Sequence, residues 1–415
     1  MQTSFLQLDQ ILNQHQPLWR FEPFHQSAQS ALPWLKDYPD LCHWLGALSI
    51  EQVVAYKSAT SRLLVDIEEA FPSAKMLSRL ISLPKEADLP TESDLSNKSQ
   101  LPTQNNAPFK LARGIDSGIP GRKLQQITSM GRFLLANQKG QQWLEWCSGK
   151  GYLGRVLASH SQQLVTSFEW QQSLCDAGQK EAHNKSLNMQ FIQGDALSPE
   201  AKSVLTKDQH AVALHACGDL HVRLIEHATA AGSQAITVSP CCYHLIEKQQ
   251  YQPLSAYAIA HSTLVLSKAE LRIPLQETVT GGQRVVRHRE QEMSYRLGFD
   301  LLLKQCLGLT DYVAIPSIKK SMLAAGFKDF CFWAAEQKNI VLPEVNFDYW
   351  QQKGEQRFCH MERLSLVQQM FRRALELWLV YDRGLFLQEC SYNVTVTEFC
   401  NRSVTPRNII IHATK

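Results

Sequence analysis

The chain has 415 residues, of which 44% are hydrophobic and 20% are charged. These proportions are ordinary for globular proteins and exclude a largely disordered, coiled-coil or collagen-like chain, and the length predicts about two to three domains. The 42 lysines and arginines and 39 aspartates and glutamates give a net charge of +3. A nucleic-acid partner would therefore require a locally basic surface.

The sequence predicts a cytoplasmic protein. No apolar run approaches the ~18 residues of a membrane-spanning helix, and the first residues, MQTSFLQ, do not form a basic stretch followed by an apolar one. The 11 cysteines are scattered and include no CxxC pair. This pattern favours free thiols in a reducing compartment over a disulfide framework.

Residues 1–83 are predicted to form a helical N-terminal module. Apolar residues recur at helical spacing from Ile50 to Ile67. We interpret the large aromatic residues of this region as a small helical core, and a platform that stacks nucleic-acid bases is the alternative. The aromatic residues are Trp19, Phe21, Phe24, Trp34, Tyr38 and Trp44.

The composition changes sharply at residues 84–108, which are rich in Pro, Ser, Thr, Asn and Asp and show no periodicity. We predict a flexible linker here and a second domain over residues 109–415. Within that domain, residues 246–357 are predicted to be an insertion of mixed helix and loop. A long helix is predicted over residues 358–390, where apolar residues share one face.

From about residue 120, short apolar runs alternate with helical stretches five times in succession. Parallel strands need crossover connections, so this alternation predicts an α/β fold with a parallel sheet and helices on both of its faces. The last two apolar runs, NVTVTEFC and RNIIIHATK, lie close together in the chain. They predict an antiparallel C-terminal hairpin.

A glycine-rich turn follows the first predicted strand of this sheet. The segment LEWCSGKGYLG matches GxGxxG at Gly149, Gly151 and Gly154. Such a turn lets the backbone approach a nucleotide at a helix N-terminus. The match alone is weak, because any tight strand-to-helix turn favours glycine.

Acidic residues are predicted at the carboxyl ends of the first three strands. Glu145 precedes the glycine turn, Glu169 can accept hydrogen bonds from both hydroxyls of a ribose, and Asp195 can reach an adenine amine. Three acids at one sheet edge favour a nucleoside that carries a positive charge over one that carries a pyrophosphate.

These features resemble the class I S-adenosylmethionine-dependent methyltransferases, whose pattern is an acidic residue, GxGxG, and acids after strands two and three. Here Cys147 replaces the first glycine of the pattern. The resemblance covers roughly residues 120–245 and the hairpin, and it implies a Rossmann-like seven-stranded sheet with S-adenosylmethionine as cofactor. The cofactor-binding residues implied are Glu145, Cys147, Ser148, Gly149, Gly151, Glu169, Trp170, Asp195, Ala196 and His215.

The motifs CSGKG, HACGDL, PCCYH and TPRNIII, in this order, narrow the resemblance. They are similar to the branch that contains methyltransferase-like protein 25, the GST C-terminal domain-containing protein and the tRNA 2′-O-methyltransferase with a CHHC zinc finger. The branch implies RNA (tRNA or rRNA) as substrate. Protein or small-molecule substrates and a non-catalytic adaptor are alternatives, and a nicotinamide-dependent oxidoreductase is a rival against which Glu145, Asp195 and the hairpin argue.

Cysteine-rich segments, HACGDLH and SPCCYH, follow the fourth and fifth predicted strands and should face the same crevice as the cofactor. We favour Asp219 or His244 as a general base; nucleophilic thiols, as in RNA cytosine-C5 methyltransferases, are a second possibility. A metal ion held by His215, Cys217, Cys241, Cys242 and His244 is a third possibility, but these residues show no dedicated ligand spacing, so no metal site is assigned. Cysteines packed as small hydrophobes are the structural alternative. The candidate catalytic residues are Cys217, Asp219, Cys241, Cys242, Tyr243 and His244.

The segment GGQRVVRHR, residues 281–289, is locally basic. Its arginines suit contacts with RNA phosphates, which position RNA without reading its sequence. A solvated basic loop is the alternative.

Overall fold

The structure is a computed structural model, and it describes residues 1–29, 31–84, 109–276 and 283–415. The predicted linker therefore lies outside the described residues, except for Pro84. Among the described helices, none combines the length and the apolar character that crossing a membrane requires.

The chain divides into two compact units. We call them the sheet unit and the helical unit. The sheet unit comprises Met1–Gln10, Ile81–Leu275 and Leu375–Lys415, and the helical unit comprises Ile11–Leu80 and Gln276–Ala374.

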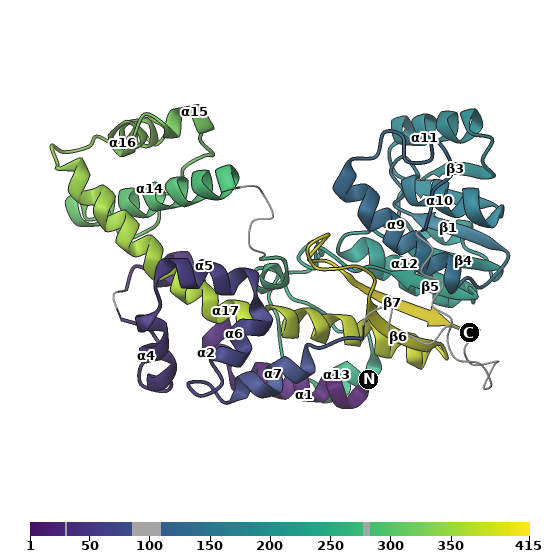
Figure 1. Ribbon diagram of the computed structural model, residues 1–415, viewed down its shortest axis with the longest axis horizontal. Helices are drawn as coiled ribbons and strands as arrows, with labels where there is room; N and C mark the ends of the chain where they lie inside the picture. Colours follow the sequence, from purple (N-terminus) through teal and green to yellow (C-terminus); the bar gives the residue numbers. More distant parts are fainter. Residues whose placement is uncertain (30, 85–108, 277–282) are drawn as a thin grey trace. The chain divides into compact units, whose positions relative to one another are not determined.

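The sheet unit contains a seven-stranded sheet in the order β3-β2-β1-β4-β5-β7-β6 (Figure 1). Strands β1 to β5 are parallel to one another, and β7 runs antiparallel to both β5 and β6. This is the seven-stranded class I methyltransferase sheet with the antiparallel hairpin that the sequence predicted. The strands are β1 Gln142–Trp146, β2 Val165–Glu169, β3 Met189–Gln193, β4 Gln209–Ala213, β5 Ala235–Val238, β6 Asn393–Glu398 and β7 Ile409–Thr414.

The strand order reverses at β1, which pairs with β2 on one side and β4 on the other. Right-handed crossovers then place α10 (Tyr152–Ser161) and α11 (Gln172–Asn184) on one face of the sheet and α12 (Asp219–Ala231) on the opposite face. Every residue of β2 and β4 is buried, as expected for strands covered on both faces. The reversal opens a crevice at the carboxyl ends of β1 and β4, where α/β folds bind ligands.

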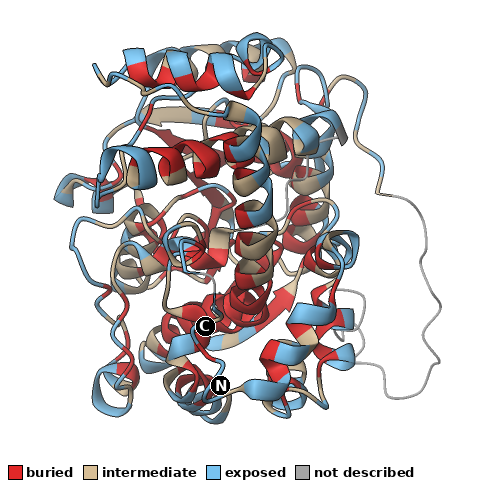
Figure 2. Ribbon diagram, turned by 90° about the vertical axis from the view of Figure 1, so that its left-hand side faces the viewer, coloured by how far each residue is buried: buried red, intermediate tan, exposed pale blue. Residues whose placement is uncertain are grey.

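Helices of both units present an apolar face to a core. In Figure 2 most helices carry buried residues on one side and exposed residues on the other. Helix α9 packs against α10, and its Phe133 joins Trp143 and Val156 in the core beside the sheet. The remaining elements of the sheet unit are α9 Gly121–Ala136, η2 Pro199–Val204, α13 Ala256–His261 and η3 Glu270–Leu275, and α1 is Gln2–Gln14.

A buried polar network joins α12 to α17 (Phe347–Glu389) within the sheet unit. The Arg383 guanidinium donates from Nε to His221 Nε2 (2.7 Å) and from Nη1 to the Tyr251 hydroxyl (3.1 Å). Asp382 accepts from the Tyr251 hydroxyl and from both the amide and the hydroxyl of Ser255. Each polar side chain of this network therefore has a partner, as the low dielectric of a core requires.

The helical unit has its own aromatic core. Trp19 and Trp34 are buried, and their indole N–H groups donate to the carbonyls of Leu12 and Pro17. The interpretation as core is therefore confirmed for Trp19 and Trp34, whereas Phe21, Phe24, Tyr38 and Trp44 are half-buried. The helices are α2 Gln16–Trp19, α3 Pro23–Gln26, α4 Pro39–Ala47, α5 Ile50–Ser58, α6 Thr60–Asp66, α7 Ser73–Leu80, α14 Gln283–Leu307, α15 Lys320–Leu323, α16 Phe327–Glu336 and the first part of α17.

The observed division differs from the predicted boundary at residue 83, because side chains of α17 hold the N-terminal helices. Gln368 donates to the Trp19 carbonyl (2.7 Å), and Arg363 donates to the carbonyls of Leu45 (3.2 Å) and Leu48 (2.8 Å) at the end of α4. The N-terminal helices thus form one unit with residues far along the chain.

The predicted insertion is divided in the same way: residues 246–275 stay with the sheet, and residues 276–357 belong to the helical unit. The long helix is also longer than predicted, since it begins at Phe347 rather than at residue 358. In the helical unit, Arg357 and Asp300 form a buried ion pair at 2.5 Å. Arg357 also donates to the Phe24 carbonyl, which binds the N-terminal helices to both α14 and α17.

Candidate active site

The turn between β1 and α10 contains three residues with left-handed backbone: Cys147 (φ 54°), Gly149 (φ 60°) and Gly151 (φ 67°). This conformation costs a non-glycine residue ~1–2 kcal/mol, so Cys147 replaces a glycine without abandoning a glycine-like backbone. A Cβ on Gly151 would lie 2.5 Å from the ring of Phe191, whereas a Cβ on Gly149 would meet nothing within 4 Å. The turn is therefore packed on one side and open at Gly149.

Glu169, at the end of β2, is fixed beside this turn. Its Oε2 accepts from the amide of Gly149 (2.8 Å), and its Oε1 accepts from the amide of Gln171 (3.0 Å). A carboxylate offers about four acceptor positions, so these two bonds leave capacity for ligand hydroxyls. The Ser148 hydroxyl is buried and has no partner among the described residues, so it can hydrogen-bond a ligand.

Glu145 is buried in β1 and has partners within the protein. Its Oε2 accepts from the Ser167 hydroxyl (2.9 Å), and the amides of Leu153 and Gly154 at the start of α10 also hydrogen-bond to the carboxylate. Burial raises the pKa of Glu145 to about 7, against the effect of these hydrogen bonds. The carboxylate thus supports the glycine turn, and with Cys147, Ser148 and His215 it lines a small cavity.

The remaining predicted cofactor residues lie at the ends of β2 and β3. Trp170 is 61% exposed, which leaves the indole ring free to face a ligand. Asp195 is exposed, with Oδ1 accepting from the Leu197 amide (2.9 Å), and Ala196 is buried. An exposed ring next to two acids, Glu169 and Asp195, can contact a purine face and the polar groups around it.

The two cysteine-rich strand ends are held against each other. The Gly218 amide donates to the Cys241 carbonyl, and the Asp219 amide donates to the Leu245 carbonyl, both at 3.0 Å. Gly218 has φ 57°, and a Cβ there would lie only 1.9 Å from the Leu245 carbonyl oxygen. Only glycine permits this close approach, so Gly218 brings HACGDLH into contact with SPCCYH.

Three predicted residues, Cys217, Cys241 and Cys242, meet at this contact. Their sulfur atoms all lie within 4.8 Å of one another, and those of Cys217 and Cys241 are 3.4 Å apart. Cys241 is buried, and the other two are half-buried. The hydrogen bond from the Cys241 thiol lowers the pKa of Cys242 to about 5, and the same contacts together with burial raise the pKa of Cys241.

The other predicted catalytic residues have different surroundings. Asp219 Oδ2 accepts from the Glu247 amide (2.8 Å), so this carboxylate holds a loop. His244 is half-buried, and its Nδ1 has no hydrogen-bond partner among the described residues. Burial and then the nearby charge of Arg272 lower the pKa of His244, which keeps the imidazole neutral near pH 7.

Tyr243 is only 1% exposed, and the guanidinium of Arg383 lies 5.3 Å from its ring centre. Tyr243, a predicted catalytic residue, therefore lies in the core with its ring beside Arg383. Tyr243 lies in a turn directly after Cys242, whose backbone is left-handed (φ 48°).

Sequence analysis missed a group of cations around this edge. Lys123 and Arg407 lie near His215, and Lys268 and Arg272 lie near His244. These residues come from separate parts of the chain, so no basic run marks them. The basic run that the sequence did show lies elsewhere: its described arginines belong to α14 in the helical unit, and residues 281–282 lie outside the described residues.

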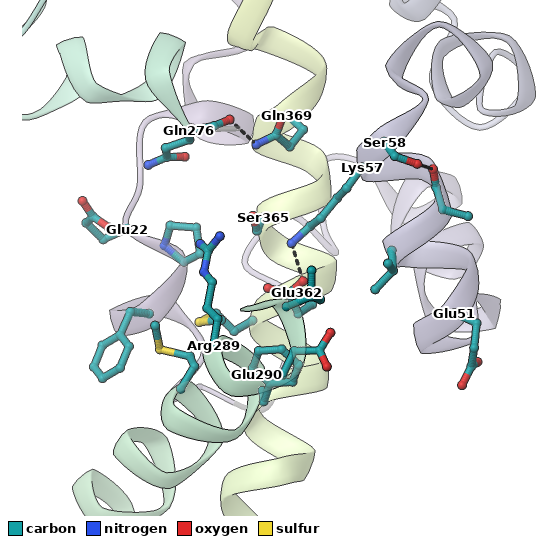
Figure 3. Close-up of a pocket in the computed structure, with 18 residues that line it drawn as sticks. Glu22, Glu51, Lys57, Ser58, Gln276, Arg289, Glu290, Glu362, Ser365 and Gln369 are labelled. Atoms are coloured by element: carbon teal, nitrogen blue, oxygen red, sulfur yellow. Dashed lines mark hydrogen bonds and ion pairs between the residues drawn. The ribbon is translucent and has the colours of Figure 1, made fainter. Parts of the chain in front are cut away.

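A separate cavity of about 560 Å³ lies in the helical unit (Figure 3). Lys57 and Glu362 form an ion pair (2.6 Å) in its wall, and Arg289 and Glu290 of α14 also line it. Sequence analysis did not identify this cavity, since its walls come from α3, α5, α14 and α17. It contains none of the predicted catalytic or cofactor-binding residues.

In comparisons with known proteins, the part of the chain that contains this sheet edge matches a family model. Residues 122–249 match a model described as "Methyltransferase domain". The Glutathione S-transferase C-terminal domain-containing proteins of Bos taurus and Mus musculus are 31% and 32% identical to this chain over 130 and 129 residues. These matches cover 30% of this chain, and they span only 20% and 19% of those relatives.

Solved structures of methyltransferases resemble this chain, but their TM-scores are low. Magnesium protoporphyrin IX methyltransferase of Synechocystis PCC 6803, solved with bound SAH, is 11% identical, covers 74% of this chain and 89% of its own, and has a TM-score of 0.31. The 23S rRNA methyltransferase ErmE is 14% identical, covers 57% and 96%, and has a TM-score of 0.23. At these scores the likenesses support no inference about substrate. The family match carries the conclusion that the chain contains a methyltransferase domain, which includes the glycine turn and both cysteine-rich strand ends.

Proposed function

We propose that the chain is a cytoplasmic S-adenosylmethionine-dependent methyltransferase that acts on RNA. The observation that carries this proposal is the turn between β1 and α10, which is open at Gly149 beside the fixed Glu169 carboxylate. The unpartnered Ser148 hydroxyl in the same turn fits a polar ligand. The family match over residues 122–249 supports methyl transfer as the reaction.

The residues present fit S-adenosylmethionine. Glu169 would bind the ribose hydroxyls, Trp170 would contact the purine face, and Asp195 would accept from the adenine amine. Ser148 and the backbone around Gly149 would hold the polar groups nearest the turn. When bound, the cofactor supplies a methyl group activated by a positively charged sulfur.

His244 is the proposed general base. An oxygen or nitrogen that accepts a methyl group must lose a proton, and a neutral imidazole at the crevice can take that proton. His244 meets this requirement because its pKa is lowered and Nδ1 is unpartnered among the described residues. Asp219 fits the role less well, since its carboxylate already binds the Glu247 amide.

RNA is the proposed substrate class because positive charge collects around the reacting edge. Lys123, Lys268, Arg272 and Arg407 lie near His215 or His244. Cations gathered at one edge suit contacts with a sugar–phosphate backbone, which position RNA without reading its sequence. The similarity of the four short motifs to a branch that includes a tRNA 2′-O-methyltransferase supports the same substrate, in preference to protein or a small molecule.

Methyl transfer from labelled S-adenosylmethionine tests the proposal. Purified protein is incubated with total RNA or with total protein from cells that lack it. We expect ribonuclease-sensitive label in RNA, and at subsaturating cofactor much less label with Glu169→Ala. Asp176→Ala, an exposed change on α11, is the matched control. Label confined to protein would overturn the RNA assignment, and failure of both transfer and S-adenosylhomocysteine binding would overturn the activity.

The base is tested by turnover at saturating cofactor. His244→Ala should lower turnover by ~100-fold or more while cofactor binding is kept, because the proton acceptor is lost. Asp219→Asn retains an acceptor for the Glu247 amide and should reduce turnover much less. A denaturant-stable protein–RNA adduct that disappears in one cysteine variant would instead establish nucleophilic thiol chemistry.

A further inference from the structure

We propose that Cys217, Cys241 and Cys242 bind a zinc ion at the carboxyl ends of β4 and β5. Zinc bound by thiolates has Zn–S distances of ~2.3 Å in a tetrahedron, which places sulfur atoms ~3.8 Å apart. The sulfurs of Cys217 and Cys241 are 3.4 Å apart, and all three lie within 4.8 Å of one another. Small side-chain adjustments therefore suffice to bind the ion.

The backbone is arranged to bring two adjacent cysteines into one cluster. Neighbouring residues of an extended strand face opposite sides, so Cys241 and Cys242 would ordinarily point apart. Cys242 instead has a left-handed backbone with φ 48°, which breaks the alternation. Its carbonyl accepts from the Leu245 amide (2.8 Å), and the Cys241 carbonyl accepts from the Gly218 amide (3.0 Å). These bonds fix the positions from which all three thiols extend.

The ligand set selects the ion. Thiolates are soft ligands that favour zinc over magnesium or calcium, and the described cluster contains cysteines alone. Three protein ligands leave a fourth coordination position, as in catalytic zinc sites. Three thiolates with one zinc ion carry a net charge of −1, which the nearby Arg407 would offset. The half-buried thiols of Cys217 and Cys242 give the ion a route into the site.

Metal content tests this inference without substrate or cofactor, so its outcome is independent of the methyltransferase proposal. The full-length protein is dialysed against zinc and then against buffer, and bound metal is measured by mass spectrometry. We expect about one zinc per chain. Cys217→Ser, Cys241→Ser and Cys242→Ser should each reduce bound zinc at least ~tenfold, whereas Cys306→Ser, at an exposed position on α14, should retain it.

Cobalt substitution supplies a second measurement on the folded, unmodified chain. Cobalt(II) in a thiolate site gives an intense sulfur-to-metal charge-transfer band, which should appear in the wild-type protein and in Cys306→Ser. Absence of both bound zinc and this band in the wild type would overturn the inference. Zinc kept by all three cluster variants, or a Cys217–Cys241 disulfide recovered without added oxidant, would also overturn it.

Discussion

The first three strands of the sheet unit and the helices of the helical unit differ in how far along the chain their partner elements lie. In the sheet unit, β1, β2 and β3 pair in chain order, with each crossover helix beside the strands that it connects. In the helical unit, Lys57 pairs with Glu362 and Gln368 binds the carbonyl of Trp19, across 305 and 349 residues. Periodicity reveals which face of an element is apolar, but it does not reveal which distant element covers that face.

The contrast between the two units would be wrong if residues 1–83 folded alone. We expect this fragment to show no cooperative thermal unfolding, because the carbonyls at the end of α4 and the apolar faces lose α17. Circular dichroism and amide proton dispersion measure this. A fusion of residues 11–80 to residues 276–374 is the control and should unfold cooperatively. A sharp transition in the short fragment would restore the predicted boundary.

Removal of the Asp300 carboxylate tests how much a contact between distant parts of the chain stabilises the helical unit. Asp300→Ala leaves the buried Arg357 without its partner and should lower the free energy of unfolding by ~3–5 kcal/mol. Hydrogen exchange in α14 and α16 reports the loss in this unit. The double variant Asp300→Leu, Arg357→Met should recover much of the stability. A change below ~1 kcal/mol in the single variant would contradict the role given to this pair.

In the sheet unit, we expect a substitution in the candidate cofactor site to change ligand affinity and to leave the fold unchanged. Glu169→Ala removes a charged acceptor and should weaken S-adenosylhomocysteine binding by ~10- to 150-fold, equivalent to ~1.5–3 kcal/mol. Calorimetry measures the affinity, with Asp176→Ala as the matched control. Amide hydrogen exchange in the helical unit should be the same in the Glu169→Ala variant and the wild type. Equal affinity in both variants would remove Glu169 from the cofactor site.

The smallest effect that we expect is a loss of stability of the sheet unit in mild acid. Burial, and then the charge of Arg383, lower the pKa of His221 well below 6.5, so the folded sheet unit holds this imidazole neutral. Below ~6.5 the unfolded chain binds a proton that the folded chain excludes, so stability is full above that pH and falls by up to ~1.4 kcal/mol per pH unit for this group. Exchange of the β4 and β5 amides at pH 7 and 5.5 measures the loss.

The control for this pH effect is His221→Gln, which removes the titrating group. The variant should show a smaller difference between the two pH values, although buried His210 in β4 titrates in the same direction. An identical pH dependence in wild type and variant would show that His221 does not contribute.

The residues predicted from sequence are those that depend on local pattern. The turn at Cys147 and the acid at Glu169 were found because strand, turn and helix follow one another directly. The close contact of the three thiols could not be predicted, since Cys217 and Cys241 are 24 residues apart and meet only through folding. The cations near His244 were missed for the same reason, and the burial of Tyr243 was not foreseen because a sequence motif does not report burial.

Gly218 determines whether the two cysteine-rich strand ends can meet. A Cβ at this position would lie 1.9 Å from a backbone oxygen, and no side-chain rotation can relieve such a clash. Replacement of this glycine would therefore separate the two strand ends in a single step, whatever residues flank it. Among sequences that share the cysteine pattern, the glycine distinguishes those able to form the cluster from those that only carry its cysteines. Gly218 is thus a steric requirement of the cluster that the thiols alone do not reveal.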